Sequence, residues 1–119
     1  MKVLSLFDGI SCGMLALQRA GIPVECYDAF EIDKYAVTVS KRNFPVIVHH
    51  GNVYDGDFTQ FKGYDLLLGG SPCTYWSIAK KDREIDCDGE GFRLFQEYVR
   101  ALEESGCQYF LYENNYSVH

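Results

Sequence analysis

The sequence predicts an α/β domain built around a parallel β-sheet. Short apolar runs alternate along the chain with amphipathic stretches, which is the pattern of successive βαβ units. With 119 residues, 47% of them hydrophobic, the chain can form one compact core but has little room for a second. We therefore expect one doubly wound layer system, with about five strands in the order 3-2-1-4-5.

Five segments are predicted to be strands because each is short, apolar and bounded by turn residues. They are residues 2–7, 24–30, 46–49, 64–69 and 108–113. The first, fourth and fifth lack polar alternation, as expected for strands that are covered on both faces. The fifth strand would lie at an edge of the sheet, where the apolar residues 109–112 would be exposed as a template for another strand.

Helical periodicity predicts the connecting helices. The first helix opens around Met14 to Gln18, and the second contains Tyr35 and Val39. The last places apolar residues at i, i+1, i+4, i+5 and i+8 on one face, namely Leu94, Phe95, Tyr98, Val99 and Leu102. Residues 74–90 contain a charged run without a sustained period, so we expect a mobile surface loop there.

Composition excludes several classes of protein. The net charge of −6 gives no basic footprint, so binding to nucleic acid would need determinants other than clustered Lys and Arg. No stretch reaches the roughly 18 apolar residues of a membrane span, and the start has no signal peptide, which predicts a soluble cytoplasmic protein. The five cysteines have no metal-binding spacing, and His49 and His50 are interpreted as a strand end, so we expect reduced thiols and no metal site.

The turn after the first predicted strand, residues 7–13, indicates a site for a nucleoside cofactor. Its glycines, Gly9 and Gly13, permit close backbone approach where the first helix begins. Their spacing does not match the dinucleotide fingerprint G-x-G-x-x-G, so an NAD-dependent dehydrogenase is disfavoured.

Polar groups also follow the second and third predicted strands. Glu31 can accept hydrogen bonds from both ribose hydroxyls, and Ile32 can cover an adenine face. After the third strand, Asn52 and Val53 can offer an amide side chain and a backbone N–H to an adenine edge. Taken alone, each of these residues is also typical of an ordinary loop in an α/β protein.

Two later strands end in groups suited to one-carbon chemistry at carbon 5 of a pyrimidine. Cys73 follows a Gly-Gly-Ser-Pro sequence and would supply a thiolate nucleophile, and Glu113 would supply a carboxylic acid. The alternatives are that Cys73 is a buried strand-end thiol and that Glu113 is a solvated strand end.

Taken in order, the segments LFDGISCG, FEID, GNV, GGSPC, GFRLF and YENN resemble the motifs of the cytosine-5 DNA methyltransferase family. The segments LSLFDGI and GGSPC are most similar to the branch of the family that includes the animal de novo enzymes and many phage and bacterial enzymes. The resemblance implies the Rossmann-like fold of S-adenosylmethionine-dependent methyltransferases. It also implies methyl transfer to carbon 5 of cytosine in duplex DNA through a covalent cysteine adduct, as in bacterial or phage restriction-modification systems.

The resemblance also implies residue roles. Phe7 would lie against the adenosine, Glu31 on the ribose, and Leu94 on the far side. The methionine part would lie on Asp8, Gly9, Ile10, Ser11 and Cys12, and the adenine would be surrounded by Ile32, Asn52 and Val53, with Pro72 completing the cofactor site. Cys73 would attack carbon 6 of a flipped cytosine, while Glu113 would bind its ring nitrogen and exocyclic amine.

Two departures from the family pattern qualify these expectations. Asn52 replaces the usual acidic residue, although its carbonyl oxygen could still accept from the adenine amino group. The later motifs and the target-recognition region are absent, so residues 1–119 would form a partial catalytic domain whose sheet stops before its last two strands. The chain would then be part of an enzyme, or a non-catalytic fragment that binds S-adenosylmethionine weakly. The exposed edge at 108–113 would self-associate or pair with a second-half chain.

Overall fold

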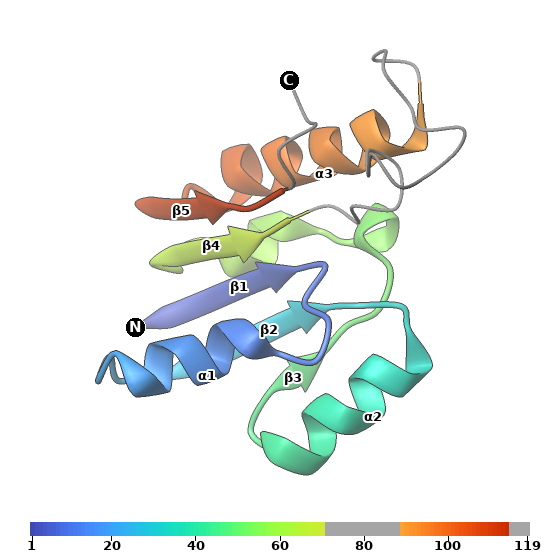
Figure 1. Ribbon diagram of the computed structural model, residues 1–119. Helices are drawn as coiled ribbons and strands as arrows, with labels where there is room; N and C mark the ends of the chain where they lie inside the picture. Colours follow the sequence, from blue (N-terminus) through green and yellow to red (C-terminus); the bar gives the residue numbers. More distant parts are fainter. Residues whose placement is uncertain (71–88, 115–119) are drawn as a thin grey trace.

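The computed structural model of the protein describes residues 1–70 and 89–114, and within them it contains one five-stranded sheet (Figure 1). All strand pairings are parallel and the order is β3-β2-β1-β4-β5, which confirms the predicted fold class and topology. The elements along the chain are β1 (Lys2–Leu6), α1 (Cys12–Arg19), β2 (Cys26–Phe30), α2 (Lys34–Asn43), β3 (Val48–His49), η1 (Val53–Asp55), η2 (Phe58–Phe61), β4 (Leu66–Gly69), α3 (Glu90–Ser105) and β5 (Tyr109–Tyr112).

The central strand β1 divides the hydrophobic core into two layers. Val3 packs with Met14 and Leu17 of α1 on one face of the sheet. Leu4 and Leu6 point to the opposite face, where a second cluster forms against η2 and α3. Because successive side chains of a strand point to opposite faces, one strand contributes to both cores, and helices cover both sides of the sheet.

All five predicted strands are present, although each is shorter than expected. β1 stops at Leu6 because Phe7 has a φ of 55°, a left-handed conformation that ends the extended strand. The two 3-10 helices η1 and η2 were not predicted, since segments of three and four residues have no measurable period. Each begins at a residue whose side chain accepts a backbone N–H two positions on, Asn52 for η1 and Asp57 for η2.

The predicted loop at 74–90 is wrong at its last residue. Glu90 is the first residue of α3, and Gly89 in an extended conformation is its N-cap. The remainder of that loop lies outside the described residues, apart from Gly89. None of the helices in the described ranges is long and apolar enough to cross a membrane.

The edge strand β5 exposes most of the apolar side chains that the sequence placed there. Tyr109, Phe110 and Leu111 are 57%, 60% and 63% exposed. Tyr112 is the exception to that expectation, because it is half-buried between the rings of Phe95 and Tyr98 of α3.

Candidate functional site

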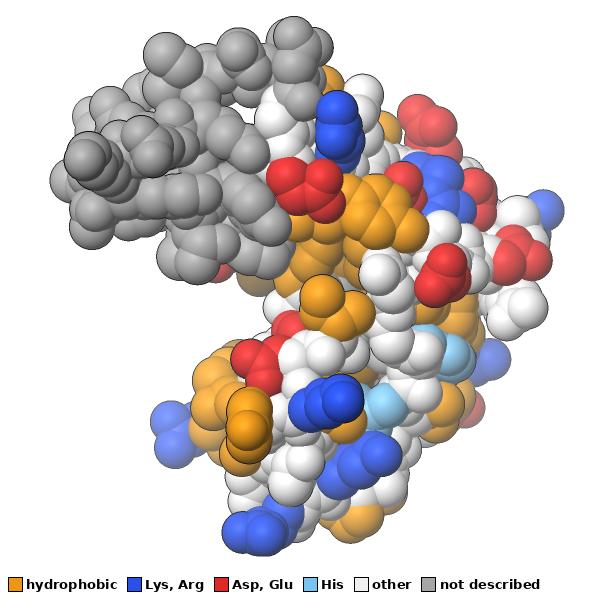
Figure 2. All heavy atoms as spheres, turned by 90° about the vertical axis from the view of Figure 1, so that its right-hand side faces the viewer, with side chains coloured by type: hydrophobic (Ala, Val, Ile, Leu, Met, Phe, Trp, Pro, Cys, Tyr) orange, Lys and Arg blue, Asp and Glu red, His pale blue; other side chains and the backbone are white. Residues whose placement is uncertain are grey.

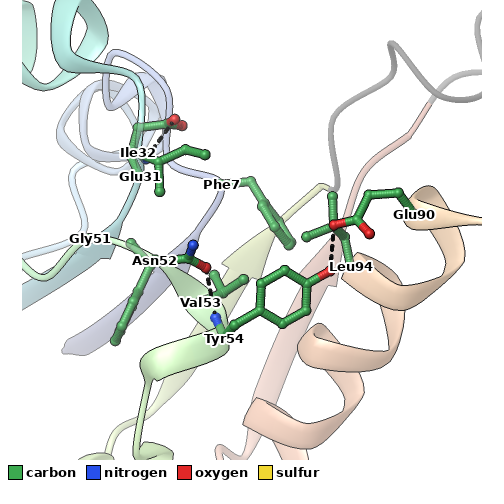
Figure 3. A pocket seen from close by; sticks show the side chains of 10 residues that line it. Phe7, Glu31, Ile32, Gly51, Asn52, Val53, Tyr54, Glu90 and Leu94 are labelled. Atoms are coloured by element: carbon green, nitrogen blue, oxygen red, sulfur yellow. Dashed lines mark hydrogen bonds between the residues drawn. The ribbon is translucent and has the colours of Figure 1, made fainter.

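A pocket opens at the carboxyl ends of the strands, between β1 and β2 on one side and η1 and α3 on the other. Figure 2 looks onto this end of the molecule and shows hydrophobic side chains gathered in its middle with acidic side chains beside them. The residues that line the pocket are Phe7, Phe30, Glu31, Ile32, Gly51, Asn52, Val53, Tyr54, Glu90 and Leu94 (Figure 3). Crevices outside the carboxyl ends of strands are where open α/β sheets bind ligands.

Glu31 is held in the pocket by backbone groups. Its Oε1 accepts the N–H of Gly9 at 2.8 Å, and its Oε2 accepts the N–H groups of Ile32 at 3.0 Å and Asp33 at 2.9 Å. A carboxylate offers about four acceptor positions, so this arrangement fixes the side chain and still leaves it able to bind another donor. The bond from Gly9 also ties the turn after β1 to the turn after β2.

Asp8, one residue earlier than Gly9, is used differently. Its Oδ1 accepts the hydroxyls of Ser5 and Tyr27, each at 2.6 Å, and its Oδ2 accepts the hydroxyl of Ser11. These three donors are buried, and Asp8 is not among the residues that line the pocket. Burial, followed by the Asp8 carboxylate, raises the pKa of Tyr27 far above its usual value, so the phenol remains a donor.

The hydroxyl network extends from Asp8 to β3. Ser11 contacts Ser40 of α2 at 2.5 Å between hydroxyl oxygens, and Ser40 lies 3.3 Å from Nε2 of His49. Gly13 belongs to the same region, since a Cβ there would lie 2.9 Å from the Tyr27 hydroxyl oxygen. The glycine of this turn therefore makes room for the phenol of a neighbouring strand.

The opposite wall of the pocket is a side-chain pair that the sequence did not reveal. The hydroxyl of Tyr54 donates to Oε1 of Glu90 at 2.6 Å, which joins η1 to the first turn of α3. Burial, and then the Glu90 carboxylate, raise the pKa of Tyr54 to about 12. Their separation of 36 residues gives no sequence signal for this contact.

Arg100 of α3 fixes the segment behind the pocket. Its guanidinium donates to the carbonyl oxygens of Val53 at 3.0 Å and Gly56 at 2.8 Å. It also pairs with Glu97 and Glu104 on its own helix and lies 4.5 Å from the ring centre of Phe58. The position of η1, and hence of Val53 in the pocket, therefore depends on α3.

Most predicted cofactor residues that are described meet in this pocket. Phe7, Glu31, Ile32, Asn52, Val53 and Leu94 all line it, whereas Asp8, Gly9, Ile10, Ser11 and Cys12 form the adjoining turn outside its lining. Phe30, Gly51, Tyr54 and Glu90 also line it and were not among the predicted cofactor residues. Phe30 could have been recognised as the residue that ends β2 directly before Glu31.

Of the two predicted reacting groups, Glu113 is described, whereas Cys73 lies outside the described residues, as does the predicted cofactor residue Pro72. The N–H of Glu113 donates to the Gly69 carbonyl at 2.9 Å, which continues the pairing of β4 with β5. A Cβ on Gly70 would fall 2.1 Å from the carbonyl oxygen of Glu113. Only glycine fits at this position, and the chain that leads from Gly70 to Cys73 therefore starts directly beside Glu113.

The histidines at the end of β3 have structural partners, as expected for a strand end. His50 contacts Asp28 of β2 at 2.8 Å and stacks on Phe30 with ring centres 4.9 Å apart. Among residues 1–70 and 89–114 no group of three or more His, Cys, Asp or Glu side chains could hold a metal ion.

Comparisons with known proteins agree with this fold. Residues 1–118 match the family described as C-5 cytosine-specific DNA methylase. Orphan methyltransferase M.SPRI of Bacillus phage SPR is 36% identical over 116 residues, covering 96% of this chain and 26% of the phage protein. Type II methyltransferase M.HgiCII of Herpetosiphon aurantiacus is 34% identical over 116 residues, covering 95% of this chain and 25% of that protein.

A solved structure is similar in fold. The crystal structure of a Spodoptera frugiperda DNMT2 mutant has a TM-score of 0.74 and 24% sequence identity, covering 97% of this chain and 35% of that one. The chain spans about a quarter of the length of the curated relatives that it matches.

Proposed function

Because the chain belongs to the C-5 cytosine-specific DNA methylase family, we propose that it supplies the S-adenosylmethionine site and the nucleophile of a DNA (cytosine-5)-methyltransferase. The observation that supports this most strongly is the pocket in which Glu31, fixed by three backbone N–H groups, faces apolar walls at the carboxyl edge of the sheet.

The polar and apolar groups that line the pocket fit an adenosine. Glu31 accepts from a ribose hydroxyl, since its carboxylate is already oriented and keeps one acceptor position. Phe7, Ile32 and Leu94 provide apolar contact for the base, and Asn52 and Val53 lie where its edge would be read. The turn formed by Asp8, Gly9, Ile10, Ser11 and Cys12 supports the methionine part, with Pro72 beyond it.

In this proposal Cys73 is the nucleophile. Its thiolate adds to carbon 6 of a flipped cytosine, while the carboxyl group of Glu113 hydrogen-bonds ring nitrogen 3 and the exocyclic amine and stabilises the charge that develops on the ring. S-adenosylmethionine supplies the methyl group that carbon 5 then acquires. Solvent then accepts the proton from carbon 5 and the Cys73 sulfur departs as a thiolate, which restores the aromatic ring and leaves 5-methylcytosine and S-adenosyl-L-homocysteine as products. The pairing of Glu113 beside Gly70 at the end of β5 supports this role.

The proposed macromolecular partner is duplex DNA, and residues 1–119 are proposed to be part of a catalytic domain. The match to a DNA methylase family over 118 residues and the partial coverage of longer relatives support both statements. The phage and bacterial relatives support action in a bacterial cytoplasm.

The exposed apolar edge of β5 supports a further partner. We propose that it pairs with a strand from a second copy or from a chain that supplies the remaining motifs. Sedimentation equilibrium tests the first arrangement. A dimer that dissociates in Phe110→Lys supports self-association, whereas a monomer at about 100 µM, where weak complexes form, contradicts it.

Labelled S-adenosylmethionine and duplex DNA containing 5-fluorocytosine test the proposed function. The fluorine cannot leave as a proton does, so a reacting cysteine stays attached to the DNA and is seen on a denaturing gel. A labelled adduct that is absent in Cys73→Ser would show that the chain performs the chemistry. Cofactor binding without an adduct would favour the alternative, a non-catalytic fragment that binds S-adenosylmethionine. Absence of both would contradict the proposal.

A further inference from the structure

The side chain of Asn52 has two chemically different ends, and the fold uses one of them. Its Oδ1 accepts the N–H of Tyr54 at 2.9 Å and so caps η1. A backbone N–H can only donate, so the amide oxygen must face Tyr54 and the amide nitrogen must face away from it. Figure 3 shows this arrangement, with the nitrogen of Asn52 directed away from the Tyr54 backbone.

The Asn52 amide has one favourable orientation, because the η1 segment that it caps is itself held in place. Rotating it by half a turn would place its NH₂ group against the N–H of Tyr54, which would replace a hydrogen bond with two facing donors. Tyr54 is itself held in place by two hydrogen bonds. Its hydroxyl donates to Glu90, and the carbonyl oxygen of the preceding residue, Val53, accepts from Arg100. The residue that lines the pocket at this point therefore presents a donor.

We propose that Asn52 makes the nucleoside pocket tolerant of 6-oxopurines in place of adenine. This inference rests on the proposed function, since it assumes that the edge of the cofactor base lies at Asn52. A purine with oxygen at carbon 6 can accept from the amide nitrogen. The 6-amino group of adenine is itself a donor, so at Asn52 it can use only the second lone pair of Oδ1, which already accepts the N–H of Tyr54.

The substitution Asn52→Asp isolates this effect. A carboxylate caps a helix as well as an amide does, so one oxygen can remain on the Tyr54 N–H. The other oxygen then replaces the donor with an acceptor, which matches a 6-amino group and repels a 6-oxo group. The matched control is Asp57→Asn, which alters the charge by one unit at the cap of η2, where Oδ1 accepts the N–H of Thr59 at 3.1 Å outside the pocket lining.

Calorimetric titration with S-adenosyl-L-homocysteine and S-inosyl-L-homocysteine tests the proposal, using the 119-residue chain. We expect the natural chain to bind the two ligands with affinities within about threefold of each other. Asn52→Asp should shift the ratio toward the adenine ligand by about tenfold or more, the size of one hydrogen bond, and Asp57→Asn should leave it unchanged.

The two proposals fail in different ways. A strong preference of the natural chain for the adenine ligand that Asn52→Asp does not increase would overturn the tolerance and leave the cofactor site in place. A shift of equal size in the opposite direction in Asp57→Asn, which removes a negative charge where Asn52→Asp adds one, would also overturn it, because the effect would then be one of general charge. Failure of every variant to bind either ligand would overturn this inference together with the proposed function.

Discussion

Asp8 and Glu31 lie in the turns that follow β1 and β2, and each carboxylate accepts three hydrogen bonds. The donors to Asp8 are the hydroxyls of Ser5, Ser11 and Tyr27, all buried. The donors to Glu31 are three backbone N–H groups of the turns themselves. Asp8 therefore connects elements within the molecule, whereas Glu31 lines the pocket.

The difference shows how neighbouring residues decide what a carboxylate does. The short side chain of Asp8 points toward the interior, because the buried hydroxyl groups beside it need an acceptor. A longer glutamate that accepts from backbone N–H groups remains at the surface of its turn and is fixed there. Four experiments test this division between stability and binding.

The largest expected effect is on folding. Asp8→Ala leaves three buried hydroxyls without their charged acceptor, so we expect the free energy of unfolding to fall by about 3 kcal/mol. Urea denaturation followed by circular dichroism measures it. Asp55→Ala, at an exposed aspartate of η1, is the control and should change stability by less than about 0.5 kcal/mol. Equal losses of unfolding free energy in Asp8→Ala and Asp55→Ala would contradict the structural role of Asp8.

The next effect is on binding. Glu31→Gln removes the charge that would accept from the ribose, and we expect about a hundredfold weaker binding of S-adenosyl-L-homocysteine by calorimetry. The unfolding free energy should fall by only about 1 kcal/mol, because the three N–H groups lie near solvent. A large loss of stability with unchanged affinity would reverse the assignment of the two carboxylates.

A smaller loss of stability is expected when one donor is removed. Tyr27→Phe retains the buried ring and deletes a hydroxyl bonded to the Asp8 carboxylate, so the unfolding free energy should fall by about 1.5 kcal/mol. Combining it with Asp8→Ala in a double-mutant cycle measures the coupling. Strictly additive losses would show that the two side chains do not interact.

The smallest effect depends on pH. Burial, and then the nearby Lys41, lower the pKa of His49 below its usual value. The unfolded chain therefore binds this proton at a higher pH than the folded protein does, so stability is lost as the pH falls below about 6.5. His49→Gln should lose less stability than the natural chain between about pH 7.5 and about pH 5.5 in urea titrations. Parallel curves would contradict this contribution.

The sequence predicted the sheet order and much of the pocket, because both depend on local patterns. Apolar runs identified the strands, and Glu31, Ile32 and Asn52 follow strand ends, which meet at one edge of a parallel sheet. The resemblance of the ordered motifs to a known family assigned roles to these residues that the patterns alone left open.

What the sequence could not predict depends on contacts between distant segments. The Tyr54–Glu90 pair and the bonds from Arg100 to η1 join residues more than 35 positions apart. The inward orientation of Asp8 likewise requires the Tyr27 hydroxyl, which reaches the turn because Gly13 has no side chain. Such contacts arise from packing and have no period in the sequence.

The bonds from Arg100 to η1 also have a thermodynamic consequence. The guanidinium of Arg100 holds the carbonyls of Val53 and Gly56, so a ligand that fixes Val53 also restrains helix α3. Linkage is reciprocal, so whatever orders α3 strengthens ligand binding by the same free energy by which the ligand stabilises the helix. The pocket and the helix are therefore thermodynamically coupled, through Arg100 and through the Tyr54–Glu90 pair.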